Sequence, residues 1–330
     1  MALTPSNREH ALQIQAGTSG RKSGHAFEDA VAHRINSRAY PLRFSGLLNE
    51  HLLVGEPERL LLQYIAETLG GRTIQSASAL STGALATSEE GQKWLHINGV
   101  EVRRCKSDIL LTLRFGSGTE HTVGVSTKQC NNITPTNAQL FFTTARAFAD
   151  LLASNGIPVS DDAVYALRQF CGDAGFRPCD NSALMAHREV DPRRFFWEET
   201  HTPGRQEWES TLSDNQASIT RLLLQKAYLD DPYSPEFLLH KARRADSWER
   251  TEVALYTIDE LVAHSQRYAP FHLRPYSVRK GTYKDPPGVS HMAPRFGIVQ
   301  MQRGGQAQHP EQLQFNLQAG YFYKIEQFRP

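Results

Sequence analysis

Asp108 and Lys128 stand at the ends of two neighbouring segments, and their chemical types suit the hydrolysis of a phosphate ester. Such a reaction needs a hard divalent cation, which is held by oxygen ligands, polarises the phosphate and activates water. A nearby lysine commonly stabilises the charge that develops on the phosphate. Ser126 lies two positions before Lys128, and a pleated strand places both side chains on one face. We therefore expect a catalytic site at Asp108, Ser126 and Lys128.

The segments that carry these residues have the patterns of two strands. Residues 108–113 form a short apolar run, and residues 122–128 alternate between apolar and small or polar side chains. Between them, Gly116-Ser117-Gly118 is typical of a turn. The pattern predicts a hairpin that brings Asp108 and Lys128 together.

The remaining periodicity predicts a mixed α/β or α+β fold, with a central mixed β-sheet flanked by helices and a helical insertion. Phe27, Val31 and Ile35 form one stripe of a helix at residues 25–37. We expect a flexible arm at residues 1–23 and one domain at 24–330, with a helical middle at about 160–265 and a strand and loop region at about 270–330. Further helices are predicted at 57–69, 138–152, 161–170, 205–229 and 235–245, and further strands at 296–301 and 312–317.

The segments Lys106-Ser107-Asp108 and Ser126-Thr127-Lys128 resemble the PD-(D/E)XK nuclease superfamily, in which one strand carries an acid and the next carries an acid, any residue and a lysine. Here Ser107 replaces the proline and Ser126 replaces the second acid. Some restriction enzymes of the superfamily carry Asn, Gln or Ser at that second position. The resemblance covers about residues 24–152, and it implies a restriction-endonuclease-like core, Mg²⁺ as cofactor and the activity of a type II restriction endonuclease in a restriction–modification system.

The second carboxylate must then come from elsewhere, and Glu28 is the first candidate. Many restriction enzymes of this fold supply a glutamate from a helix that precedes the strands, and Glu28 lies beside the apolar stripe of the first predicted helix. The metal ligands implied are Asp108 and Glu28. The alternative for Glu28 is a solvent-facing residue favoured by the helix dipole. Glu101 is a second candidate for the missing acid.

Two segments have the side chains that read base edges in DNA. Gln129, Asn131, Asn132 and Thr134 follow Lys128 directly, although the same residues also suit a capped loop before a helix. Gln302, Arg303 and Gln306 lie around a Gly-Gly loop, for which a polar surface hairpin is the alternative. In the following strand, Gln312, Gln314 and Asn316 share one face.

The composition suits an intracellular protein but does not point to nucleic acid. The sum of 36 Lys and Arg against 35 Asp and Glu gives a net charge of +1, so a basic DNA-binding surface must arise locally. The four cysteines form no CxxC pair, and no stretch is apolar enough to span a membrane, which predicts a reduced, cytoplasmic location. Phosphate-loop, HExxH and GxSxG motifs are absent.

Three functions fit these patterns. A homodimeric restriction enzyme would match a two-fold double-stranded DNA target. A non-catalytic DNA-binding protein would follow if the replacement at Ser126 had abolished catalysis. A repair nuclease would cut damaged or branched DNA without a defined sequence.

Overall fold

The computed structural model of the chain describes residues 25–82, 96–97, 100–101, 105–180, 194–226, 233–277, 279–280, 283–284, 286–303 and 312–322. These residues divide into two compact units, each with its own sheet. The first unit takes residues 25–138 and 225–260, and the second takes residues 139–224 and 261–322. The expected arm at residues 1–23 lies outside the described residues, and the prediction of a single domain stays a prediction.

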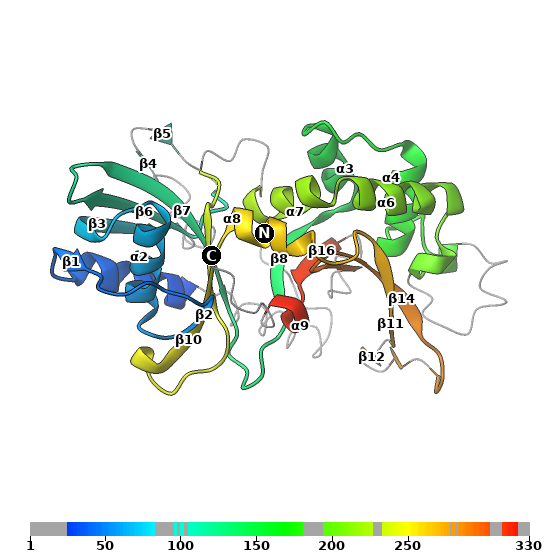
Figure 1. Cartoon of the computed structure of the whole chain (residues 1–330). Coiled ribbons are helices and arrows are strands. Elements are labelled where there is room, and N and C mark those ends of the chain that lie inside the picture. The colour runs from blue at the N-terminus through cyan, green and yellow to red at the C-terminus, as the bar shows by residue number, and fades with distance from the viewer. Residues whose placement is uncertain are drawn as a thin grey trace. The chain divides into compact units, whose positions relative to one another are not determined.

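The first unit is built on a seven-stranded mixed sheet with the order β1-β3-β6-β7-β9-β10-β2. In this sheet β7 and β9 are parallel, and the other neighbours are antiparallel. The curved strands β3, β6 and β7 lie side by side in Figure 1. The strands are β1 (Leu42–Arg43), β2 (Leu52–Gly55), β3 (Thr73–Ser81), β6 (Ile109–Phe115), β7 (Glu120–Gln129), β9 (Phe237–Lys241) and β10 (Thr251–Thr257).

Two helices cover one face of this sheet. They are a helix at residues 25–37 and α2 (Pro57–Thr68), which begins at a proline that suits the first turn of a helix. The stripe of Phe27, Val31 and Ile35 packs with Leu61 and with Val125 of β7 in one apolar core. The predicted helices at 25–37 and 57–69 and the predicted hairpin are therefore confirmed.

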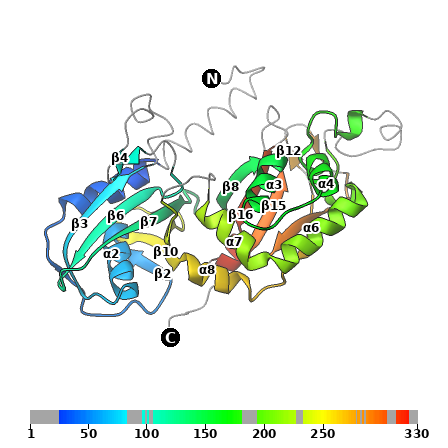
Figure 2. The same cartoon turned by 90° about the horizontal axis from the view of Figure 1, so that it is seen from above.

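The second unit has a five-stranded sheet with the order β11-β14-β15-β16-β8. Helices gather over one face of it in Figure 2, and Phe148 of α3 packs there against Phe315 of β16 and Trp208 of α6. The strands are β8 (Ala138–Thr144), β11 (His272–Tyr276), β14 (His291–Phe296), β15 (Val299–Arg303) and β16 (Gln312–Leu317). The helices are α3 (Ala145–Ala153), α4 (Asp161–Cys171), α6 (Thr202–Asp214), α7 (Gln216–Gln225), α8 (Ile258–Ser265) and α9 (Ala319–Phe322).

Short elements complete the description. Two small sheets consist of β4 (His96–Ile97) with β5 (Val100–Glu101) and of β12 (Arg279–Lys280) with β13 (Tyr283–Lys284). The 3₁₀ turns are η2 (Pro178–Asp180), η3 (Trp197–Glu199) and η4 (Trp248–Arg250). Within the described ranges, no helix has the length and apolar character needed to cross a bilayer.

The mixed α/β architecture is confirmed, but four predicted elements were wrong in detail. A helix was predicted at residues 205–229, and the described part of this range is divided at Asn215 between α6 and α7. Residues 235–245 were predicted as helix and contain β9, whose apolar run is buried because the strand lies inside the sheet, parallel to β7. Residues 138–152 are not one helix: β8 ends at Thr144, whose hydroxyl then caps α3 by accepting from the Ala147 backbone N–H. The predicted strand at 296–301 is interrupted at Gly297, where a φ of 53° turns β14 into β15.

Candidate active site

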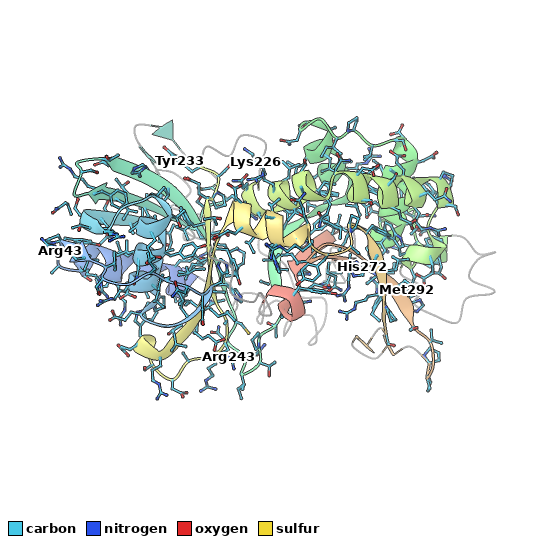
Figure 3. The ribbon with its side chains drawn as sticks, viewed as in Figure 1. Arg43, Lys226, Tyr233, Arg243, His272 and Met292 are labelled. Carbon is cyan, nitrogen blue, oxygen red and sulfur yellow. The ribbon has the colours of Figure 1, made fainter. Side chains whose placement is uncertain are left out.

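The backbone places Asp108 one residue before β6, at the end of the paired strands β6 and β7. The Asp108 N–H donates to the Val125 carbonyl at 2.9 Å, and the Asp108 carbonyl accepts from the Thr82 N–H at 2.9 Å. On its other side, Ser107 is fully buried and its hydroxyl donates to the Tyr233 carbonyl at 2.7 Å. Tyr233 is labelled in Figure 3. Both neighbouring strands and the Tyr233 segment thus fix the backbone of Asp108.

Gly124 allows this close packing of the Ser107 segment on β7. A Cβ at position 124 would lie 2.9 Å from the Ser234 carbonyl oxygen and closer still to the Ser107 hydroxyl. Only a residue without a side chain fits between these groups. Gly124 therefore contributes to the position of Asp108 although it touches no reacting group.

The carboxylate of Asp108 meets three groups of β7 at one oxygen. Asp108 Oδ2 accepts from the Thr127 N–H at 2.6 Å and from the Ser126 hydroxyl at 3.1 Å, and it lies 3.5 Å from Lys128 Nζ. Among the described residues, no group donates to the other oxygen, Oδ1. The predicted partners Asp108, Ser126 and Lys128 are therefore together in space.

Lys128 is held in this position from two sides. Its ammonium donates to the Ser126 hydroxyl at 3.0 Å and to the Thr127 carbonyl at 2.6 Å, while 19% of its side chain stays accessible. The neighbouring parallel strand places His240 beside Lys128. Burial and the charge of Lys128 lower the pKa of His240 to about 3, so this histidine is neutral at pH 7 and adds no competing positive charge.

Glu28 approaches from the first helix and is buried, with 7% of its surface accessible. Its Oε1 accepts from the Thr127 hydroxyl at 2.9 Å, and its Oε2 lies 3.2 Å from Nδ1 of His25. Burial raises the pKa of Glu28, and the negative charge of Asp108 raises it further, while the hydrogen bonds from Thr127 and His25 oppose this rise. The charge of Asp108 thus reaches Glu28 and disfavours the ionised form of Glu28.

Thr127 joins the two acids and was not singled out by the sequence analysis. Its N–H donates to Asp108 and its hydroxyl donates to Glu28, and the residue is 5% exposed. In the acid–any residue–lysine pattern it occupies the unspecified middle position. Strand alternation turns its side chain to the helix-covered face, opposite Ser126 and Lys128, and that inward direction was the available signal.

The donor set at this point suits a hard cation. Asp108 and Glu28 offer carboxylate oxygens, and Mg²⁺ commonly takes one or two carboxylates and completes its shell with water and substrate phosphate. Two neighbouring carboxylates, one of them buried, also make a site in which a divalent cation relieves electrostatic repulsion. Within the described part of the chain, no three His, Cys, Asp or Glu side chains converge as a metal cage.

Glu101, the alternative acid, belongs to β5, and its side chain lies outside the described residues. The predicted DNA-binding residues after Lys128 are described. Gln129 ends β7, and its Nε2 is buried with no hydrogen-bond partner in the described structure. The Asn131 side chain accepts from Lys241 Nζ at 3.2 Å, and the carbonyl oxygens of Asn132 and Thr134 face the Arg244 N–H and the Cys130 thiol.

The second predicted DNA-reading segment lies in the second unit. Gln302 faces Gln314 across β15 and β16, and it shares the polar face with Gln314 and Asn316, as expected from the alternation. Arg303 points to the opposite face of the sheet, beside Leu313. Gln306 lies outside the described residues.

Comparison with known proteins gave similarity of structure alone. No protein-family model matches the chain, and no curated protein matches it either. Among solved structures, the chain is similar to the crystal structure of restriction endonuclease MspI in complex with its cognate DNA. That similarity has a TM-score of 0.45 and 11% sequence identity, and it covers 92% of each chain.

Proposed function

We propose that this protein is a type II restriction endonuclease that hydrolyses phosphodiester bonds of double-stranded DNA at a specific short sequence, with Mg²⁺ as cofactor. The observation that carries the proposal is the meeting of Asp108 Oδ2 with Lys128 Nζ at 3.5 Å, beside a second acid, the buried Glu28, which accepts a hydrogen bond from Thr127. An Asp and a Lys 20 positions apart in the sequence carry little information, but their convergence beside a buried glutamate is a specific arrangement.

Each group has a chemical role in this proposal. Asp108 and Glu28 would hold Mg²⁺, which when bound polarises a phosphate and lowers the pKa of a bound water. Lys128, fixed through Ser126, places a positive charge beside Asp108, where the charge on a phosphate in attack would develop. Thr127 keeps the two acids at a fixed separation.

Ser126 favours one alternative, a DNA-binding protein without catalysis. Its hydroxyl stands where the family pattern has a second acid, so the metal depends on Glu28 for that carboxylate. Glu28 lies on the other face of β7 but contacts the same segment, which supports the catalytic reading.

Incubation of the purified protein with a mixture of plasmids separates these functions. We expect discrete fragments with MgCl₂ and intact DNA with EDTA, and sequencing of the fragment ends should find one common short sequence. Intact DNA together with retarded complexes on a gel would support the non-catalytic alternative. Nicks without a common sequence would support a repair nuclease.

A further inference from the structure

Two arginines and one histidine lie together on one face of the five-stranded sheet. His272 of β11 faces Arg295 of β14 across the strands, and Arg274 lies two positions after His272 on the same face. Directly opposed and diagonal neighbours of this kind bring long side chains within reach of one another. Figure 3 labels His272, which lies on β11, an edge strand of the five-stranded sheet.

The opposite face of the same strands is apolar and buried. Phe296, Met301 and Phe315 have no accessible surface there. His272 and Arg295 are partly buried on the polar face, and Arg274 is exposed. The arginines and the histidine therefore lie outside the apolar core, and Arg274 is open to solvent.

No carboxylate partners this group among the described residues. The Arg274 guanidinium lies over the Tyr321 ring, 6.0 Å from its centre. Nδ1 of His272 and Nε of Arg295 are buried atoms without a hydrogen-bond partner in the described structure. Buried polar atoms without partners carry a free-energy cost, and they are uncommon in folded proteins unless a ligand satisfies them.

The electrostatics of the cluster favour an anion as its ligand. Burial lowers the pKa of Arg295, and the charge of Arg274 lowers it further. Burial also lowers the pKa of His272, with added contributions from Arg295 and Arg274. Like charges that destabilise one another in this way are stabilised when a negatively charged group binds between them.

The cluster continues into a row of amides. Arg295 faces Gln300, and Gln300 faces Asn316 on the next strand. The Gln314 amide donates to Asn316 Oδ1 at 3.0 Å, which orders the row. A guanidinium pair matches the geometry of a phosphate, and the half-buried amides of Gln300 and Gln314 suit the polar edges of a nucleic acid, whereas Asn316 is buried.

We infer that His272, Arg274 and Arg295 form a phosphate-binding site, and that a backbone phosphate of double-stranded DNA is its occupant. The choice of DNA rests on the proposed function, whereas the phosphate chemistry rests on the cluster alone. Phosphate contacts fix the register of a protein on the duplex, so the site would position DNA on the polar face of this sheet.

The first part of the test uses inorganic phosphate as the probe. Isothermal titration of the full-length protein should show binding, and the double variant Arg274→Gln/Arg295→Gln should bind at least about tenfold more weakly. Arg205→Gln removes the same charge from the second unit at an arginine that already pairs with Glu209, and it should bind like the wild type. Arg295→Lys keeps the charge but loses the guanidinium fork, and it should give intermediate binding.

The second part measures the affinity for duplex DNA in EDTA at several salt concentrations. Loss of one or two phosphate contacts should reduce the slope of log K against log salt by about 1–2 in the double variant and leave it unchanged in Arg205→Gln. An unchanged slope with lost phosphate binding would overturn DNA as the occupant. If the wild type binds no inorganic phosphate, and its salt slope equals that of the double variant, the site itself is overturned. A wild-type protein that binds no duplex would contradict the proposed function, and the phosphate titration would still decide on the site.

Discussion

At the scale of single residues, Thr127 is the group on which the geometry of the two acids depends. Its hydroxyl donates to Glu28 and its N–H donates to Asp108. Thr127→Val keeps the shape and the N–H but removes the hydroxyl, so the pKa of Glu28 should rise further and its carboxylate should lose its fixed position. We expect cleavage to fall by about 10–100-fold, as is typical when a partner of a metal ligand is removed.

The matched control is Thr127→Ser, which restores the hydroxyl. In rate measurements across pH, the acid limb of the Thr127→Val profile should move to higher pH, and that of Thr127→Ser should stay near the wild-type position. If the Thr127→Val rate fell equally at every pH and its acid limb did not move, Thr127 would contribute only by packing.

We expect the buried Glu28 to lower the stability of the protein at pH values where its carboxylate is ionised, although the carboxylate serves the proposed activity. Its pKa is raised in the folded state by burial and by Asp108, so the folded state favours the protonated acid. The contribution of Glu28 to stability is therefore present at acid pH and is lost as the pH rises through its folded pKa. We expect Glu28→Gln to raise Tm at pH 8, to lose that advantage near pH 4, and to lower cleavage by about 100-fold or more.

Thermal denaturation at the two pH values and cleavage rates at pH 8 check this expectation. Glu50→Gln, at an exposed glutamate outside the site, serves as the control and should change neither quantity. A variant with full activity would redirect the search for the second acid to Glu101. A Tm difference that does not change with pH would contradict the raised pKa.

At the scale of elements, the position of Asp108 depends on the packing of the Ser107 segment against β7. Gly124→Ala places a Cβ 2.9 Å from the Ser234 carbonyl oxygen, so the segment must shift. We expect a loss of about 1–3 kcal/mol in the free energy of unfolding. Gly116→Ala is the control in the same hairpin, because its Cβ would find its nearest neighbour at 3.6 Å. Urea denaturation distinguishes the two, and equal stabilities would mean that the contact is not tight.

Element by element, the predictions succeeded where the pattern was local. The helix at residues 25–37 was predicted from its apolar stripe, and the hairpin of β6 and β7 was predicted from the alternation along β7. The strand β9 was missed, because a strand buried inside a sheet is an apolar run without alternation. The junction of β8 and α3 was missed, because Thr144 serves both as the end of a strand and as a helix cap.

The candidate site was predicted in the same partial way. Asp108, Lys128 and Glu28 were singled out by their types and by the elements that carry them, and the structure places them together. Thr127 and Gly124 were not, because their contributions arise from contacts with segments distant in the sequence. The cluster of Arg274 and Arg295 depends on the register between β11 and β14, which no local pattern reveals.

At the scale of the whole molecule, cleavage of both strands at a two-fold target calls for two copies of the site. We therefore expect the protein to be a homodimer when bound to its target. Sedimentation of the complex with a short duplex should give twice the chain mass of 37.1 kDa plus one DNA. A single chain per duplex that still cuts both strands would show that the enzyme acts on each strand in turn.

The most direct test of the site is the rate of DNA cleavage by Asp108→Asn. This change keeps the size of the side chain but removes the charge that faces Lys128 and helps to bind the cation. With MgCl₂, the wild type should cut plasmid DNA to discrete fragments, and Asp108→Asn should be slower by about 10³-fold or more while it keeps its fold and its DNA affinity. Asp150→Asn, at an exposed position of α3, should cut at the wild-type rate. Cleavage by Asp108→Asn at the rate of the wild type would contradict the account.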